Sequence, residues 1–159
     1  MKKINQQKGF TLIELVVVIV VTGVLAAVAA PKFMGVTTDA RKSALDGIEA
    51  TLAAQTSTIH AKSLMAANEN KASSDVTLAN GTSAAIVYGY LAGTSAAVSK
   101  LLTVDGDYTL TQAADGKSTT VSFADQGADG AKTDGCNVLY TEPTGPKKVP
   151  VITVVKDLC

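Results

Sequence analysis

A single carboxylate, Glu14, lies inside a long apolar stretch near the start of the chain. The stretch has 21 residues beginning at Phe10, and only Thr11, Thr22 and Gly23 otherwise interrupt it. A carboxylate in such a run costs about 2–4 kcal/mol near the centre of a bilayer and less near its surface. Glu14 therefore needs a partner, and its position is a functional hypothesis in itself.

Other residues that carry chemistry are few. The only histidine, His60, is expected on the polar side of a helix, solvated or packed on a sheet. No base stands beside a nucleophile as a hydrolytic triad requires. Gly116-Lys-Ser lacks the upstream Gly of a phosphate loop. The run 125–130 resembles a calcium loop faintly, with wrong spacing and no closing Glu. We expect no catalytic residue, metal or cofactor, while calcium at 125–135 stays open.

Cys136 and Cys159 are the two cysteines of the chain. In an exported domain such a pair predicts a disulfide, because the periplasm and the cell surface are oxidising. Two unrelated thiols are the alternative, which a cytosolic location would favour. Without a second pair or a close histidine, the two cysteines cannot fill a structural zinc site.

The charge balance argues against nucleic acid as a partner. Fourteen Lys and Arg balance fourteen Asp and Glu over 159 residues, a length that predicts one domain plus its first segment. Lys2, Lys3 and Lys8 precede the apolar run, so removing residues 1–9 leaves eleven basic against fourteen acidic side chains, a net charge of −3. With no Trp, three Phe and four Tyr, few rings are present to stack on bases.

The apolar run is long enough to cross a hydrocarbon core of about 30 Å as a helix. The preceding lysines predict that this end stays in the cytoplasm. A secretory signal peptide cut within 26–30 fits the topology nearly as well. Glu14 decides against it, because a simple signal sequence has no use for a carboxylate.

The string from Lys8 to Leu15, KGFTLIEL, resembles the prepilin peptidase site of type IV pilins and of the related type II secretion pseudopilins. The resemblance is close over residues 1–35. It implies cleavage after Gly9 by an inner-membrane peptidase, methylation of the new amine on Phe10, and a role in assembly for Glu14.

A physical reason supports this spacing. The new amine on Phe10 is a cation at the tip of an apolar helix, and Glu14 lies one turn away to compensate it, in its own chain or in a neighbouring subunit. Gly9 suits a peptidase because a residue without Cβ lets another backbone approach closely. Pro31 is expected to kink the helix, since it cannot donate the usual hydrogen bond.

One helix is predicted from about Phe10 to Leu64 or Met65. Its first half is apolar all round, and its second half is one-sided. The apolar positions of the second half recur at helical spacing, with Gln55 filling the missing one: Leu45, Ile48, Leu52 and Ile59. The predicted divisions are a cleaved leader at 1–9, a membrane and assembly half at 10–31, an amphipathic half at 32–65 and a globular head at 66–159.

An α+β fold is predicted, the helix packing on an antiparallel sheet of about four strands, as in the ladle-shaped pilin fold. A Cys136–Cys159 bond would close the last hairpin. The elements expected in the head are a loop at 67–83, a strand at 86–91, a short helix at 94–102 capped by Thr94 or Ser95, a hairpin of 108–112 and 119–123, a loop at 125–135, and strands at 137–141 and 149–155.

The resemblance implies a structural subunit that polymerises into a type IV pilus, with adhesion, surface attachment and motility as implied roles. The implied partners are copies of itself, the prepilin peptidase, the inner-membrane assembly platform and the secretin. The implied location is the inner membrane, then the surface of a Gram-negative bacterium. The layout, with YGYLAG at 88–93 and a closing Cys, is similar to mannose-sensitive haemagglutinin type pilins. A pseudopilin is the alternative, and an anchored periplasmic enzyme is disfavoured because catalytic residues are missing.

Overall fold

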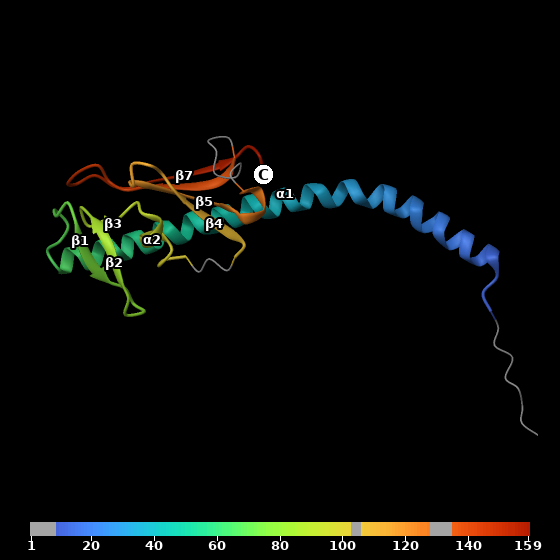
Figure 1. The fold of residues 1–159 in the computed structure, drawn as a ribbon, viewed down its shortest axis with the longest axis horizontal. Coiled ribbons are helices and arrows are strands. Elements are labelled where there is room, and N and C mark those ends of the chain that lie inside the picture. The colour runs from blue at the N-terminus through green and yellow to red at the C-terminus, as the bar shows by residue number, and fades with distance from the viewer. Residues whose placement is uncertain (1–8, 103–105, 128–134) are drawn as a thin grey trace, which may run out of the picture. The chain divides into compact units, whose positions relative to one another are not determined.

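The computed structural model describes residues 9–102, 106–127 and 135–159, without the side chains of residues 33 and 34 (Figure 1). It divides into two units, one up to Asp39 and one from Ala40 onward. The elements in chain order are α1 (Leu12–Met65), β1 (Ser74–Thr77), β2 (Ser83–Val87), β3 (Tyr90–Leu91), α2 (Ser95–Val98), β4 (Tyr108–Gln112), β5 (Ser118–Phe123), the 3-10 turn η1 (Ala124–Gln126), β6 (Cys136–Thr141) and β7 (Val151–Lys156). The predicted α+β fold is confirmed.

Helix α1 has 54 residues and matches the predicted range closely. Pro31 lies inside it and the helix assignment runs unbroken through that position, so a kink at Pro31 stays a prediction. The helix ends where Ala67 takes a positive φ of 52°. There the amide of Asn68 donates to the Ser63 carbonyl at 2.9 Å and the amide of Ala67 to the Leu64 carbonyl at 3.1 Å. These two bonds form a Schellman cap, which satisfies the last carbonyls of the helix.

One face of α1 after Ala40 is buried in the head. Leu45, Leu52 and Ile59 are 0–1% exposed, as the sequence pattern predicts. The assignment of Gln55 to this face is wrong: Gln55 is exposed, and Thr56 is buried beside Leu52 and Ile59. Thr56 is four residues from Leu52 and three from Ile59, so the helical spacing admits it better than Gln55.

A four-stranded antiparallel sheet in the order β4-β5-β6-β7 forms the larger part of the head. Its register pairs Tyr108 with Phe123 in the first hairpin and Cys136 with Lys156 at the end of the last one. Val121, Val138 and Tyr140 turn inward and join the buried face of α1 in one core. Among the described strands, β4 and β7 are the edges of this sheet.

A second, three-stranded sheet in the order β1-β2-β3 was not predicted. The loop expected at 67–83 contains β1. The single strand expected at 86–91 is instead a hairpin, formed by the end of β2 and by β3. The fold-back occurs at Tyr88 and Gly89, which have φ values of 48° and 82°. Two positive φ values in a two-residue turn suit a tight β-hairpin, and glycine takes one of them without strain.

Helix α2 is shorter than predicted but is capped as expected, since the Thr94 hydroxyl accepts from the Ala97 amide. The two sheets are joined by the Tyr140 hydroxyl, which donates to the Leu91 carbonyl at 2.7 Å in the core. Burial raises the pKa of this hydroxyl far above its usual range, so it remains a donor.

Replacing Tyr140 with Phe is expected to lower the free energy of unfolding by about 1–3 kcal/mol, because the buried Leu91 carbonyl loses its side-chain donor. Thermal unfolding of the two proteins measures the loss. Tyr108→Phe is the matched control, since the half-buried Tyr108 ring packs against Phe123 and its hydroxyl makes no hydrogen bond that the described residues show. Equal stability of Tyr140→Phe and Tyr108→Phe would show that the bond between the sheets is not stabilising.

Candidate functional site

Gly9 and Phe10 lie just before α1, outside any helix or strand, and are exposed, Phe10 to 92%. A Cβ built on Gly9 would meet no heavy atom within 4 Å. The packing of the described chain therefore does not require glycine at this position.

Glu14 caps the helix that follows. The Thr11 hydroxyl and the Thr11 amide donate to one carboxylate oxygen of Glu14 at 2.6 and 2.9 Å. The Glu14 amide donates back to the Thr11 hydroxyl at 3.3 Å. This reciprocal arrangement is a capping box, in which a Thr and a Glu three residues later satisfy free amides at a helix start. The carboxylate thus has a partner within its own first turn.

Around this cap the apolar side chains of α1 are exposed. Phe10, Ile13, Glu14, Val17 and Val18 line a shallow groove of about 340 Å³ beside it. Exposed large apolar side chains continue along all faces of the helix: Leu12, Leu15, Val16, Ile19, Val20, Val21, Val24, Leu25 and Val28. The Thr22 hydroxyl donates to the Val18 carbonyl at 2.7 Å, which satisfies the other polar group of the segment. Among the described residues, α1 is the helix long and apolar enough to cross a membrane.

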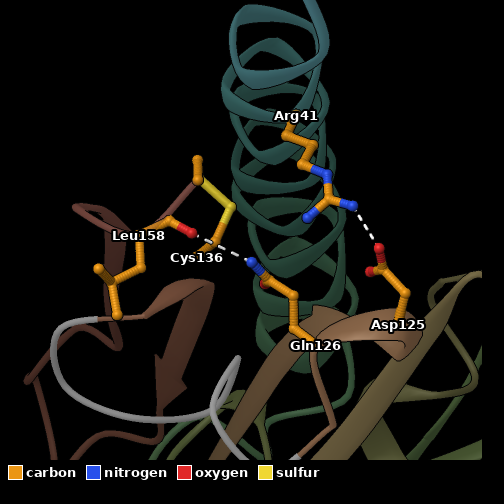
Figure 2. A network of polar contacts seen from close by, with 6 residues as sticks. Arg41, Asp125, Gln126, Cys136 and Leu158 are labelled. Atoms are coloured by element: carbon orange, nitrogen blue, oxygen red, sulfur yellow. Dashed lines mark hydrogen bonds and ion pairs between the residues drawn. A yellow bond between two sulfur atoms is a disulfide. The ribbon is translucent and has the colours of Figure 1, made fainter. Parts of the chain in front are cut away.

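Two consecutive residues of η1 tie separate segments of the head together (Figure 2). Asp125 forms an ion pair with Arg41 of α1, whose guanidinium lies 5.2 Å from the centre of the Phe123 ring. The side-chain amide of the next residue, Gln126, donates to the Leu158 carbonyl at 3.1 Å. This turn therefore contacts the helix on one side and the end of the chain on the other.

The predicted disulfide is present beside this turn. It joins Cys136 at the start of β6 to Cys159, 23 positions later in the sequence, with their Cα atoms 4.9 Å apart. The same hairpin is also joined to α1 by an ion pair, in which Lys156 Nζ lies 2.6 Å from Asp46 Oδ1. Residues 128 to 134 of the loop expected at 125–135 lie outside the described residues, so whether this loop binds calcium stays open. No group of His, Cys, Asp or Glu in the described part of the chain is arranged to hold a metal.

Replacing Cys159 with Ser is expected to lower the free energy of unfolding by about 3 kcal/mol, because a loop of this length then adds its full entropy to the unfolded chain. Thermal unfolding with and without a reductant measures the effect. The wild type should fall to the level of the variant on reduction, and the variant should not change. A variant as stable as the unreduced wild type would contradict the prediction.

His60 packs on the second sheet, one of the two positions expected for it. Its ring stacks on Tyr90 with the ring centres 4.1 Å apart, and Nδ1 lies 3.2 Å from the Gly89 carbonyl oxygen. The ring thus stabilises the turn at Tyr88 and Gly89, whose geometry leaves little room: a Cβ on Gly89 would lie 2.9 Å from the Glu69 Cα.

Residues 4–30 match the family model for the prokaryotic N-terminal methylation motif. The chain carries this motif. It includes Gly9, Phe10 and Glu14, so the capping box and the bare first half of α1 belong to it. The described head, including the disulfide, lies outside the methylation motif.

The chain is also similar to the type IV narrow pilus major component PilA5 of Thermus thermophilus. The two are 49% identical over 43 residues, which is 27% of this chain. The match spans about 37% of the length of that relative. No solved structure matches the chain significantly. The likeness to mannose-sensitive haemagglutinin type pilins therefore stays a prediction.

The capping box within the methylation motif was missed in the sequence, although its signal is visible there. Thr11 and Glu14 stand three residues apart directly before the apolar run, which is the spacing of a capping box. The contacts of η1 had no such signal, because Arg41 and Asp125 are 84 positions apart.

Proposed function

We propose that the chain is the precursor of a structural subunit of a type IV pilus. The leader 1–9 is removed by a prepilin peptidase, the amine of Phe10 is methylated, and the subunit polymerises through the first half of α1. The observation that carries the proposal is the methylation motif at 4–30 on a helix whose apolar side chains are exposed on every face.

The exposed apolar helix supports polymerisation on energetic grounds. Side chains such as Val20 and Leu25 are 58% and 65% exposed in the isolated chain. Leaving them in water costs about 25 cal/mol per Å² of apolar surface. A bilayer removes that cost before assembly, and a bundle of the same helices from other subunits removes it afterwards. One segment, at 10–31, thus serves as membrane anchor and as fibre core.

The remaining parts of the proposal follow from this assignment. The amphipathic half at 32–65 joins the anchor to the head at 66–159, which forms the fibre surface. The precursor lies in the inner membrane with its basic leader in the cytoplasm. Further partners are the assembly platform and the secretin of a Gram-negative bacterium. Adhesion, attachment to surfaces and motility are the roles proposed for the finished fibre.

Cleavage is tested by the intact mass of the membrane-bound or fibre-bound protein. The expected mass is that of residues 10–159 with the disulfide and one methyl group. A mass that includes residues 1–9, or one from a cut within 26–30, would contradict the proposal. Gly9→Leu should accumulate as full-length precursor and Gly9→Ala should be cut in part. Since a Cβ on Gly9 meets no heavy atom of the described residues within 4 Å, we expect a defect to report on the peptidase.

A pseudopilin of a type II secretion system is the alternative that shares the motif. Electron microscopy of cells distinguishes the two functions. A pilus subunit gives long surface filaments at its natural level of expression, and deleting it removes them. Loss of protein secretion on deletion, with the surface filaments unchanged, would assign the chain to a secretion system instead.

A further inference from the structure

A cavity of about 270 Å³ lies in the head between α1, the loop joining β1 to β2, and the residues after α2. It is far from the methylation motif in sequence, and the proposed fibre does not require it. Its lining carries two ammonium groups, Lys62 and Lys100, and no carboxylate. The other lining residues are Gln55, Thr58, Ile59, Leu78, Ala79, Asn80 and Leu101.

Both lysines are held by the same end of one hairpin. Lys62 donates from Nζ to the Thr77 carbonyl at 2.9 Å, and Lys100 donates from Nζ to the Ser83 carbonyl. Thr77 and Ser83 are directly paired across β1 and β2. The two ammonium groups therefore bind the outward carbonyls of two residues that are paired at the end of one hairpin. Each keeps two further donors, because an ammonium group has three.

A third donor is oriented by the loop itself. The side-chain oxygen of Asn80 accepts from the Thr82 amide at 3.1 Å and from the Thr82 hydroxyl at 2.7 Å. With its oxygen occupied, Asn80 has its NH₂ group left to offer the cavity. The loop is closed by the Leu78 amide, which donates to the Thr82 carbonyl at 2.8 Å. The arrangement of donors is thus built before any ligand arrives.

Among the residues that the structure describes, the lining of the cavity includes no carboxylate. In the described part of the chain, no ion pair joins Lys62 or Lys100 to a carboxylate. The cavity floor is apolar, since Ile59 is buried and Leu78 and Leu101 are half-buried. Two ammonium groups in the lining of one cavity attract an anion jointly, and because Lys100 is exposed and Lys62 is half-buried, added salt screens this attraction.

We propose that this cavity binds a small oxyanion, a carboxylate or a phosphate group. The oxyanion lies between Lys62 and Lys100 and accepts a further hydrogen bond from the Asn80 amide. The volume of the cavity is just below the range of about 300–1,000 Å³ typical of pockets that enclose larger ligands, so the cavity holds one sugar-sized group. An acidic sugar and free phosphate both supply this chemistry, and the probes below separate them.

The test uses the full chain in non-ionic detergent, titrated with sodium glucuronate, inorganic phosphate and glucose and observed by amide chemical shifts. Shifts at Leu78, Ala79 and Gly81 are expected with a dissociation constant on the order of 1 mM, and they should weaken as salt is added. A response to glucuronate alone supports an acidic sugar as the source, and a response to phosphate alone supports phosphate. A response to both supports the oxyanion site. No response to either, or an equal response to glucose, would overturn the proposal.

Variants tie the response to the cavity. Lys62→Gln with Lys100→Gln should weaken binding at least tenfold, and Lys148→Gln, an exposed lysine outside the cavity, should not change it. Asn80→Asp is the independent variant: aspartate keeps the oxygen that Thr82 needs but places a negative charge at the site, so binding should be lost. Unchanged affinity in both the double variant and Asn80→Asp would overturn the proposal.

Discussion

Replacing Glu14 with Val is expected to abolish fibres while leaving cleavage after Gly9 intact. Valine removes the cost of burying a carboxylate, so insertion into the membrane should become easier. In the proposed fibre it also leaves the Phe10 amine of a partner without its counter-charge, and breaking a buried charge pair on one side typically costs about 3–5 kcal/mol. Because fibre contacts repeat without closing, the loss is felt at each added subunit.

The capping box makes a sharper set of variants possible. Glu14→Val removes both the charge and the cap, whereas Glu14→Gln removes the charge and keeps a side chain that can serve in a capping box. Thr11→Val removes the hydroxyl that Glu14 accepts from and leaves the carboxylate in place. If the charge pair drives assembly, Glu14→Gln fails and Thr11→Val assembles.

Filament number and length by electron microscopy, with the intact mass of the membrane fraction, measure assembly and cleavage separately. If Glu14→Gln gave normal fibres and Thr11→Val gave few, Glu14 would serve the helix cap and not a neighbouring subunit. Co-expression with wild type adds a second reading: occasional Glu14→Val subunits should be incorporated, but pure mutant fibres should not grow.

Replacing Gly93 with Ala is expected to lower the free energy of unfolding by about 3 kcal/mol or more. A Cβ there would lie 1.9 Å from the Lys117 carbonyl oxygen and 2.2 Å from its carbon, so backbone must move. The same residue is held on both sides: its amide donates to Glu142 at 2.8 Å, and its carbonyl accepts from the buried Thr119 hydroxyl at 2.6 Å. A shift at Gly93 therefore disturbs β5 and the end of β6.

Gly47→Ala is the matched control with an effect of opposite sign. Gly47 lies on the exposed face of the second half of α1, and a Cβ there meets nothing within 4 Å. Alanine should raise stability by about 1 kcal/mol through helix propensity. Thermal unfolding in the same detergent compares the two variants. A Gly93→Ala protein as stable as wild type would show that the head tolerates the shift.

The sequence was sufficient to predict those parts of the fold in which apolar residues repeat with a clear period. The stripe of Leu45, Leu52 and Ile59 predicts the amphipathic half of α1, and alternation predicts the β4–β5 hairpin and strands β6 and β7. The second sheet had no such signal. Strands β1 and β2 consist largely of Ser, Ala, Asp and Thr, and β3 has two residues.

At the site, the motif could be read because its parts are adjacent in the chain. The distant contacts could not: the ion pair of Arg41 with Asp125, and the bond from Gln126 to Leu158, depend on how the sheet brings η1 beside α1 and the last strand. Nothing in a single sequence specifies such a pairing before the fold is known. The two lysines of the cavity, 38 positions apart, were missed for the same reason.

Strand β7 lies at the edge of its sheet among the described strands, and an unpaired edge invites the wrong kind of association. Its outward side chains include Val151, 57% exposed, which would suit an added strand from another molecule. The chain before it carries Lys147, Lys148 and Pro150, and Lys156 ends it. Charge and proline at such an edge discourage strand addition. In the proposed membrane-anchored precursor, whose heads are concentrated in one plane, these residues would oppose amyloid-like aggregation of the heads.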